Sequence, residues 1–279
     1  MRSIKFKSFS SGSCGNGYFL GIFNELDSCD CGVLIDAGVS PRRVKKELAR
    51  EGLGFEDISA LLLTHDHNDH IRSLGSWCKH LGRPVWTPPA LSGILAHNFL
   101  AGEHYAPCRR ELETGWNELV PGRIRVRYFA VPHDASFTCG YALMLDEHKF
   151  VIMTDIGRMV PQALSLARQC DTLVIESNYD PWMLRHGPYP KELQDRICGG
   201  QGHLSNEECA DALRDIVHPG LRNIFLCHLS EHNNTPELAY RTSAEVLGQI
   251  YAPGTALAEE KPPRLCPLPR MSPSPLFIL

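Results

Sequence analysis

The chain alternates short apolar runs with longer segments in which apolar residues recur every three or four positions. The first apolar runs predict three strands, at residues 4–9, 18–23 and 32–36. Residues 41–51 have helical periodicity, with Ser40 placed as the N-cap and Pro41 at the first helical position. The pattern therefore predicts a strand-rich first layer followed by a helix.

The same alternation continues to about residue 252. Further strands are predicted at 84–86, 124–132, 140–145, 149–154, 171–176 and 223–227. Further helices are predicted at 71–81, 89–99, 160–169, 191–198, from 205 onward and at 235–250. Ser205 is followed three residues later by Glu208, which is the capping-box spacing. Two halves, each built from strands followed by helices, predict an α/β (α+β) fold in which two sheets pack together and helices cover both outer faces.

The end of the chain has a different composition. Residues 253–279 are rich in proline and show neither helical nor strand periodicity. The sequence therefore predicts one domain over residues 1–252 and an extended or disordered tail over residues 253–279.

Length and composition are those of a chain that buries a sizeable core. The 279 residues are 43% hydrophobic and carry a formal net charge of -4, so no overall basic field attracts nucleic acid. A nucleic-acid substrate would have to be attracted by a local patch or by bound metal ions. No apolar run reaches the length of about 18 residues typical of a spanning helix, and the first residues do not have the pattern of a signal peptide. We therefore expect a cytoplasmic protein without membrane spans.

The cysteines do not predict a disulfide framework. There are 11 of them, an odd number, and their spacings are irregular. Cys29 and Cys31 form a close pair, but no second pair completes a four-cysteine zinc site. We expect reduced thiols.

Three histidines and two aspartates are packed into residues 64–70, directly after the apolar run 60–63. Zinc and similar cations bind neutral imidazole nitrogen and carboxylate oxygen, and the end of a strand holds such ligands rigidly. The spacing H-x-H-x-D-H therefore predicts a metal site made of His65, His67, Asp69 and His70.

Four more polar residues have a similar sequence context, just beyond an apolar segment: His133, Asp155, His203 and His228. A single histidine at a strand end is more often structural than functional. Several of them at one sheet edge, together with the H-x-H-x-D-H cluster, are better explained by a site for two metals.

These motifs resemble those of the metallo-β-lactamase-fold hydrolases, and most closely the YycJ/WalJ-type branch of that family. The resemblance covers residues 1–252 approximately. Besides the H-x-H-x-D-H run, it rests on SSGSCGN (10–16), LIDAG (34–38), TDIG (154–157), ESNYD (176–180), GHLSN (202–206) and HLSEHNN (228–234).

The resemblance implies a four-layer αββα sandwich with two metals at one edge of the sheets. It implies that His65, His67 and His133 hold one metal, that Asp69, His70 and His228 hold the second, and that Asp155 bridges both. The histidine-rich lining favours zinc, whereas carboxylate together with imidazole also suits manganese.

Two residues outside the ligand pattern are candidates for catalysis. The resemblance implies that His203 contacts the phosphate and donates a proton to the leaving group, as in the phosphodiester-cleaving relatives of the tRNase Z and PhnP type. Asp66 is a candidate for orienting an imidazole or the hydroxide, with capping of its own loop as the alternative.

Four polar residues are candidates for substrate binding: Ser11, Ser13, Asn16 and Asn178. The first three lie in a Gly- and Ser-rich turn that could approach a phosphate or could simply join two strands. Asn178 follows a predicted strand and could line the cleft.

Together these features predict a dinuclear metal-dependent phosphodiesterase that uses a metal-bridging hydroxide as nucleophile. The resemblance favours a DNA exonuclease. Two alternatives remain: a small-molecule hydrolase acting on a cyclic phosphodiester, a thioester or a lactam, and a metal-binding regulatory module without turnover. The presence of both Asp69 and His203 argues against the regulatory module.

Overall fold

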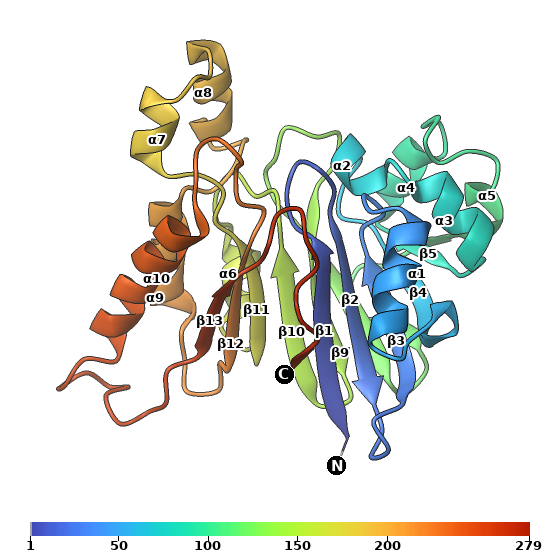
Figure 1. The fold of residues 1–279 in the computed structure, drawn as a ribbon, viewed down its shortest axis with the longest axis horizontal. Coiled ribbons are helices and arrows are strands. Elements are labelled where there is room, and N and C mark those ends of the chain that lie inside the picture. Colours follow the sequence, from blue (N-terminus) through green and yellow to red (C-terminus); the bar gives the residue numbers. More distant parts are fainter. Residues whose placement is uncertain (1) are drawn as a thin grey trace.

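The computed structural model describes residues 2–279 and contains two seven-stranded sheets packed face to face (Figure 1). The first sheet has the order β14-β1-β2-β3-β4-β5-β6 and the second the order β13-β12-β11-β10-β9-β8-β7. The first contains β1 (Ser3–Ser10), β2 (Gly17–Phe23), β3 (Cys29–Ile35), β4 (Ile58–Leu62), β5 (Val85–Thr87), β6 (Arg109–Glu111) and β14 (Phe277–Ile278). The second contains β7 (Asn117–Val120), β8 (Ile124–Ala130), β9 (Cys139–Leu145), β10 (His148–Met153), β11 (Thr172–Glu176), β12 (Asn223–Cys227) and β13 (Arg264–Pro267).

Three hydrophobic clusters follow from these layers. The central one joins the inner faces of the sheets, where side chains such as Phe6, Tyr141 and Phe225 are fully buried. The first sheet is covered by α1 (Pro41–Arg50), α3 (Leu74–Leu81), α4 (Pro89–Leu95) and α5 (Tyr105–Cys108). The second is covered by α6 (Pro161–Ala167), α9 (Asn206–Ile216) and α10 (Pro236–Ile250). Figure 1 shows these two helical layers on opposite sides of the sheets, which confirms the predicted αββα sandwich.

The capping residues identified in the sequence predicted the start of two helices correctly. Ser40 accepts a hydrogen bond from the backbone N–H of Arg43 at the start of α1, and Ser205 forms the predicted capping box with Glu208 at the start of α9. The helix predicted at 71–81 begins later, at Leu74 of α3, and a separate short helix, α2 (Asn68–Ile71), precedes it. Among residues 2–279, no helix combines the length and the apolar content that crossing a membrane requires.

The region between α4 and β8 contains elements that the hydrophobic pattern did not predict. Residues 89–99 were expected to form one helix, but α4 ends at Leu95, and α5, β6 and β7 follow. These elements are only three or four residues long. Elements of this length are too short to show a clear periodicity, so the sequence did not predict them.

The tail predicted at 253–279 differs most from expectation. Instead of lying outside the domain, it adds β13 in parallel to β12 and β14 in antiparallel orientation to β1. Leu268, between the two strands, is buried in the central cluster. Edge strands tolerate proline and need only one paired side, so they lack the alternation by which strands are recognised.

The docking of the tail can be tested at Phe277. Its ring centroid lies 4.8 Å from that of Phe225 and 6.5 Å from that of Phe6, on opposite sheets. We expect Phe277→Ala to lower the free energy of unfolding by about 2 kcal/mol, because the ring is only partly buried. Met271→Ala, in an exposed part of the same tail, should have little effect. Equal unfolding midpoints in urea for both variants would contradict the packing of the tail against the core.

Candidate metal centre

The predicted ligand residues meet where strands from both sheets end. His65 and His67 follow β4, and α2 carries Asp69 and His70. On the other sheet, the candidates follow β8, β10 and β12; they are His133, Asp155 and His228. Strands β10, β11 and β12 are parallel, so their carboxyl ends lie at the same edge of the sheet. The fold thereby brings residues from four separate parts of the chain into one cluster.

Three residues at this edge adopt left-handed backbone conformations directly after a strand. The φ angles are 63° at Asp36, 55° at Asp155 and 53° at His228. Aspartate and histidine occur in this region more often than most residues other than glycine, but it remains an unfavourable one. Such strain is concentrated at functional sites, where the surrounding structure holds it in place. Here it turns two ligand candidates and one of their supporting carboxylates toward the cluster.

The first candidate group consists of His65, His67 and His133, whose ligand atoms lie within 4.8 Å of one another. The Nε2 atom of His133 is 3.3 Å from the Nδ1 atom of His67. Two nitrogens bound to one tetrahedral zinc at about 2.0–2.1 Å are separated by roughly this distance. The Nε2 atom of His65 is buried and has no hydrogen-bond partner among the described residues. An unpaired imidazole nitrogen beside two others fits a metal ligand.

The second candidate group consists of Asp69, His70 and His228. Oδ2 of Asp69 lies 3.4 Å from Nε2 of His70 and 3.5 Å from Nε2 of His228. Asp155 lies between the two groups, with Oδ2 3.2 Å from Nε2 of His70 and Oδ1 3.7 Å from Nε2 of His133. A carboxylate in this position can contact a cation in either group.

Hydrogen bonds to the other ring nitrogens orient the imidazoles. Nδ1 of His133 donates to the carbonyl oxygen of Gly202 over 2.7 Å, and Nδ1 of His70 donates to Oδ2 of Asp36 over 2.8 Å. Each bond places a proton on Nδ1, so that Nε2 is the nitrogen left to act as an acceptor; in His70 this Nε2 lies 2.8 Å from the side-chain amide of Asn16. The sequence analysis did not identify Asp36 as a site residue, although it belongs to the LIDAG motif.

The charges within the cluster are balanced by protons. Burial disfavours the charged form of His70, but nearby carboxylates, Asp36 foremost, raise its pKa well above the ordinary value. Burial also acts against His228, yet Asp155, 3.3 Å from its Nδ1, and other carboxylates raise its pKa to about 10. In contrast, burial and the adjacent His70 lower the pKa of His65. A divalent cation would replace the extra protons, so metal binding is expected to release protons.

Glu176 is the main residue of the site that the sequence analysis missed. It ends β11 and is fully buried. Its Oε1 accepts hydrogen bonds from Nδ1 of His203 over 2.8 Å and from Nδ1 of His228 over 2.9 Å. Its Oε2 accepts from the backbone N–H groups of Ile156 and Leu204. A buried glutamate is rare unless it is paired, so an acidic residue ending an apolar strand was the available signal.

His203 lies beside the cluster without belonging to either group of three. Its ring centroid is 5.0 Å from that of His133 and 5.3 Å from that of His228. Burial lowers the pKa of His203, but the charge and hydrogen bond of Glu176 outweigh it and raise that pKa above the ordinary value. Because Nδ1 is bound to Glu176, Nε2 is the nitrogen available to a ligand in the cleft.

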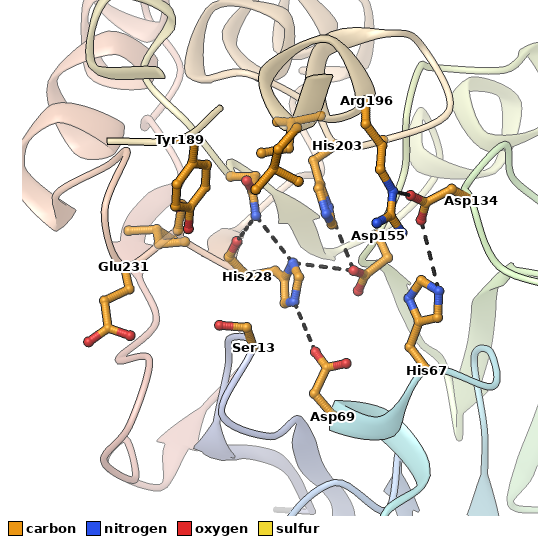
Figure 2. A pocket seen from close by; sticks show the side chains of 16 residues that line it. Ser13, His67, Asp69, Asp134, Asp155, Tyr189, Arg196, His203, His228 and Glu231 are labelled. Carbon is orange, nitrogen blue, oxygen red and sulfur yellow. Dashed lines mark hydrogen bonds and ion pairs between the residues drawn. The ribbon is translucent and has the colours of Figure 1, made fainter. Parts of the chain in front are cut away.

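The four candidate substrate-binding residues separate into two pairs. Ser11 and Asn16 are fully buried. Oγ of Ser11 accepts from the backbone N–H of His228, and the side-chain amide of Asn16 donates to Oδ2 of Asp69, so both support ligand candidates. Ser13 lines the cleft in front of the cluster (Figure 2). Asn178 also lines it, but Asn178 is buried and its side-chain amide donates to the carbonyl oxygen of His228 over 2.7 Å.

Asp66 points away from the imidazoles. Within residues 2–279, its two hydrogen bonds come from the backbone N–H and the hydroxyl of Ser136, over 3.2 Å and 2.7 Å. This geometry supports the alternative of a loop-capping aspartate over a catalytic one.

We therefore expect Asp66→Ala to change kcat less than about fivefold and to lower stability slightly, by loss of the Ser136 contacts. Removing a residue that orients a metal ligand reduces activity about 10- to 100-fold. Steady-state hydrolysis of a small phosphodiester by the purified variant distinguishes the two. A loss of the larger size would restore the catalytic role of Asp66.

The cluster opens into a cleft of about 260 Å³ (Figure 2). One wall is formed by Asp69 of α2 and by Asp155 and His228, which follow strands, with His203 beside them. The opposite wall comes from residues 189–197, outside the two sheets. Four carboxylates and one arginine are among the lining residues, so bound cations would be needed to make the cleft attractive to an anion.

Comparisons with known proteins agree with this geometry. Residues 32–228 match a family model described as a Beta-lactamase superfamily domain. Exodeoxyribonuclease WalJ from Streptococcus pneumoniae serotype 2 is 31% identical over 246 residues, which cover 88% of this chain and 89% of the relative.

Two solved structures have the same fold. The metallo-β-lactamase fold protein YhfI from Bacillus subtilis superposes with a TM-score of 0.66 at 14% identity, over 99% of both chains. Zn²⁺-bound PqqB from Methylobacterium extorquens superposes with a TM-score of 0.63 at 19% identity, over 87% of this chain and 94% of the other. At these identities the likeness concerns the fold alone.

Proposed function

Because the chain belongs to the metallo-β-lactamase superfamily, we propose that it is a dinuclear metal-dependent phosphodiesterase that removes nucleotides from the end of a DNA strand. The DNA substrate is supported by the 31% identity, over most of both chains, to a relative named as an exodeoxyribonuclease. The reaction class is supported by the residues of the cleft.

Two groups of residues would hold the metals. His65, His67 and His133 form the first, and Asp69, His70 and His228 form the second, with Asp155 shared between them. The excess of imidazole over carboxylate favours zinc, and manganese would also fit these donors. Bound divalent cations lower the pKa of a coordinated water toward about 7 and neutralise phosphate charge, which provides a nucleophile and a binding site for the diester.

The chain supplies the proton for the leaving group. Cleavage of a DNA linkage releases an alkoxide of the sugar, which needs a proton at neutral pH. His203 can deliver it from Nε2, because its Nδ1 proton is held by Glu176 and its pKa is raised. Glu176 also fixes the ring, so that the donor does not have to be oriented during the reaction.

The observation that carries the proposal is the position of His203 beside both metal-ligand groups. It is not needed as a ligand in either group of three, yet it lines the cleft and is held by a fully buried carboxylate. A hydrolase whose leaving group needs no proton has little use for such a donor.

The test compares nucleic acids, whose leaving group needs a proton, with a small diester whose leaving group does not. Metal-loaded wild type, Asp69→Ala and His203→Ala are incubated with end-labelled single-stranded and duplex DNA, with RNA, and with bis(p-nitrophenyl) phosphate. Asp69→Ala should be inactive on all of them. The rate of DNA cleavage by His203→Ala should be about 10²- to 10⁴-fold lower than that of wild type. The rate on the small diester should fall much less, because nitrophenolate leaves without a proton.

Three results would contradict the proposal. If wild type cleaves only the small diester, the nuclease assignment fails, and the small-molecule hydrolase takes its place. If His203→Ala cleaves DNA as fast as wild type, the proton-donor role fails. If metal-loaded wild type hydrolyses none of these substrates, the chain is a metal-binding module without this activity.

A further inference from the structure

The wall of the cleft opposite the metal-ligand candidates is built by a helix that packs into no core. Helix α8 (Lys191–Cys198) follows α7 (Pro181–His186), and Figure 1 shows both helices apart from the two helical layers of the sandwich. None of the eight residues of α8 is buried. Its apolar side chains Leu193 and Ile197, one helical turn apart, both line the cleft. A helix that exposes its apolar side to a catalytic cleft has a surface available for substrate.

Resting on the proposed function, we propose that α8 forms the subsite for the nucleotide next to the scissile phosphate in a single DNA strand. Arg196 binds the phosphate of that nucleotide, and Tyr189, Leu193 and Ile197 contact its base.

Charge singles out Arg196. The residues that line the cleft include four carboxylates, Asp69, Asp134, Asp155 and Glu231, and within the described chain Arg196 is the lining residue with a permanent positive charge. The metals would take the scissile phosphate, so the neighbouring phosphate of a strand needs a cation of its own. Arg196 lies at the rim, where that phosphate would pass.

The contacts of Arg196 leave it able to bind an anion. Its Nε donates to Oδ2 of Asp134, which fixes the guanidinium over the cleft (Figure 2). Oδ1 of Asp134 lies 3.3 Å from Nε2 of His133, so this pair connects α8 to the first metal-ligand group. The side chain of Arg196 is nevertheless 61% exposed. The two terminal amino groups of the fork remain for a phosphate.

The apolar part of the wall suits a base rather than a sugar or a second phosphate. Tyr189 is partly exposed in the loop before α8, and its ring makes an edge contact with the imidazole of His232, with centroids 5.9 Å apart. Aromatic side chains bind bases of any sequence by stacking, which contributes about 1–3 kcal/mol per base. A base stacked on Tyr189 would lie beside Leu193 and Ile197, which line the same cleft.

Lys191 provides a matched control on the same helix. It lies on the other side of α8, where it lines a separate cavity between α7 and α8 and pairs with Asp195 at 2.7 Å. Lys191→Gln removes one positive charge from α8 outside the cleft, whereas Arg196→Gln removes one positive charge from the cleft itself. A difference in KM or DNA binding between the two variants therefore reflects where the charge lies and not the net charge of the helix.

The experiment uses the metal-loaded protein and measures cleavage and binding separately. Cleavage is followed on a single-stranded oligonucleotide and on bis(p-nitrophenyl) phosphate, which has one phosphate. Binding is measured by fluorescence anisotropy with a phosphorothioate oligonucleotide that resists cleavage, between 50 and 200 mM salt. Arg196→Gln should raise KM for the oligonucleotide about tenfold and raise it less for the small diester, which has no second phosphate, whereas Lys191→Gln should leave both values unchanged. It should also reduce the slope of log K against log salt by about 0.7, the value for one phosphate contact on a single strand.

Conservative variants separate the subsite from a structural effect. Arg196→Lys should retain the wild-type salt slope, and Tyr189→Phe should bind the oligonucleotide as wild type does, whereas Tyr189→Ala should bind about tenfold more weakly. If Arg196→Gln has the same KM and salt slope as Lys191→Gln, the proposed subsite is wrong, although the proposed DNA cleavage remains supported. If wild type binds the oligonucleotide with an Arg196-dependent salt slope but hydrolyses only the small diester, the subsite stands and the nuclease proposal fails.

Discussion

The Asp155→Asn protein is expected to hydrolyse phosphodiesters at least about a thousandfold more slowly than wild type and to bind fewer than two metal ions per chain. A metal centre stabilises the charge of the transition state by several kcal/mol, and 4 kcal/mol corresponds to about a thousandfold in rate. Asp155 lies 3.2 Å from His70 of one candidate group and 3.7 Å from His133 of the other, so its loss is expected to affect both.

The size of this effect follows from the surroundings of the side chain. Asp155 is only 2% exposed and lies within 3.7 Å of imidazole nitrogens from four histidines: His70, His133, His203 and His228. Burial raises its pKa, but His228 and His70 outweigh burial and lower that pKa well below the ordinary value. The neutral amide of asparagine has the same shape but cannot balance the positive charge of the surrounding imidazoles or of a bound cation. Asparagine is a suitable replacement because it tolerates the left-handed φ of 55° at this position.

The measurement is the metal content of the purified variant, together with hydrolysis of bis(p-nitrophenyl) phosphate. Asp27→Asn is the matched control, since Asp27 also has a left-handed φ, of 61°, but lies in an exposed turn after β2. The control should have the metal content and activity of wild type. An Asp155→Asn protein that retains two ions and full activity would show that no cation is shared at this position.

The metal-ligand candidates were predictable because they combine two independent signals. Each follows or lies near an apolar run that forms a buried strand, and each is of a type that binds metal. The alternation of runs predicted β4, β10 and β12, and the edge at which their following residues meet comes from the rule that parallel strands end together. That rule places Asp155 and His228 at one sheet edge, whereas His65 follows β4 of the other sheet, and the assignment of these residues to two metals came from the family resemblance.

The supporting residues were less predictable, because their role depends on partners far away in the sequence. Glu176 acts through His203 and His228, which are 27 and 52 residues later. Asn16, expected in the cleft, instead donates to Asp69, 53 residues later. Hydrophobic patterning predicts which face of a strand is buried, but it carries no information on which polar side chains meet.

The wall of the cleft was predictable in part. Residues 191–198 were expected to be helical, and α8 has these bounds. Nothing in the periodicity indicated that its apolar side faces a cleft instead of a core, because both situations produce the same spacing of apolar residues. The tail strands β13 and β14 were missed for the opposite reason, since they pack without a regular pattern.

Replacing Glu176 by glutamine should shift the pH dependence of DNA cleavage to lower pH and reduce its maximum rate. The Glu176 carboxylate stabilises the protonated form of His203, against the effect of burial, through its charge and a hydrogen bond of 2.8 Å. Without that charge the pKa of His203 falls. A general acid works only while it is protonated, so activity in the variant should decline at a lower pH on the alkaline side than it does in wild type.

The same substitution should also cost stability, by about 1–3 kcal/mol. Glu176 is fully buried and accepts four hydrogen bonds, from two imidazoles and two backbone N–H groups. The side chain of glutamine has one oxygen and one NH₂ group. The NH₂ group would therefore face hydrogen-bond donors that a carboxylate oxygen accepts from in the wild type. The kinetic measurement is therefore made well below the unfolding temperature of the variant, which is determined separately at each pH.

Glu208→Gln is the control for the pH shift. Glu208 is the exposed capping-box residue of α9, and its removal affects helix α9 without changing the partner of Nδ1 on His203. The pH profile of kcat on DNA should be that of wild type in this control and shifted in Glu176→Gln. On bis(p-nitrophenyl) phosphate, whose leaving group needs no proton, the alkaline limb should be unshifted in both variants. A Glu176→Gln protein with lowered stability but an unshifted DNA profile would mean that Glu176 only holds the fold and that His203 is not the proton donor.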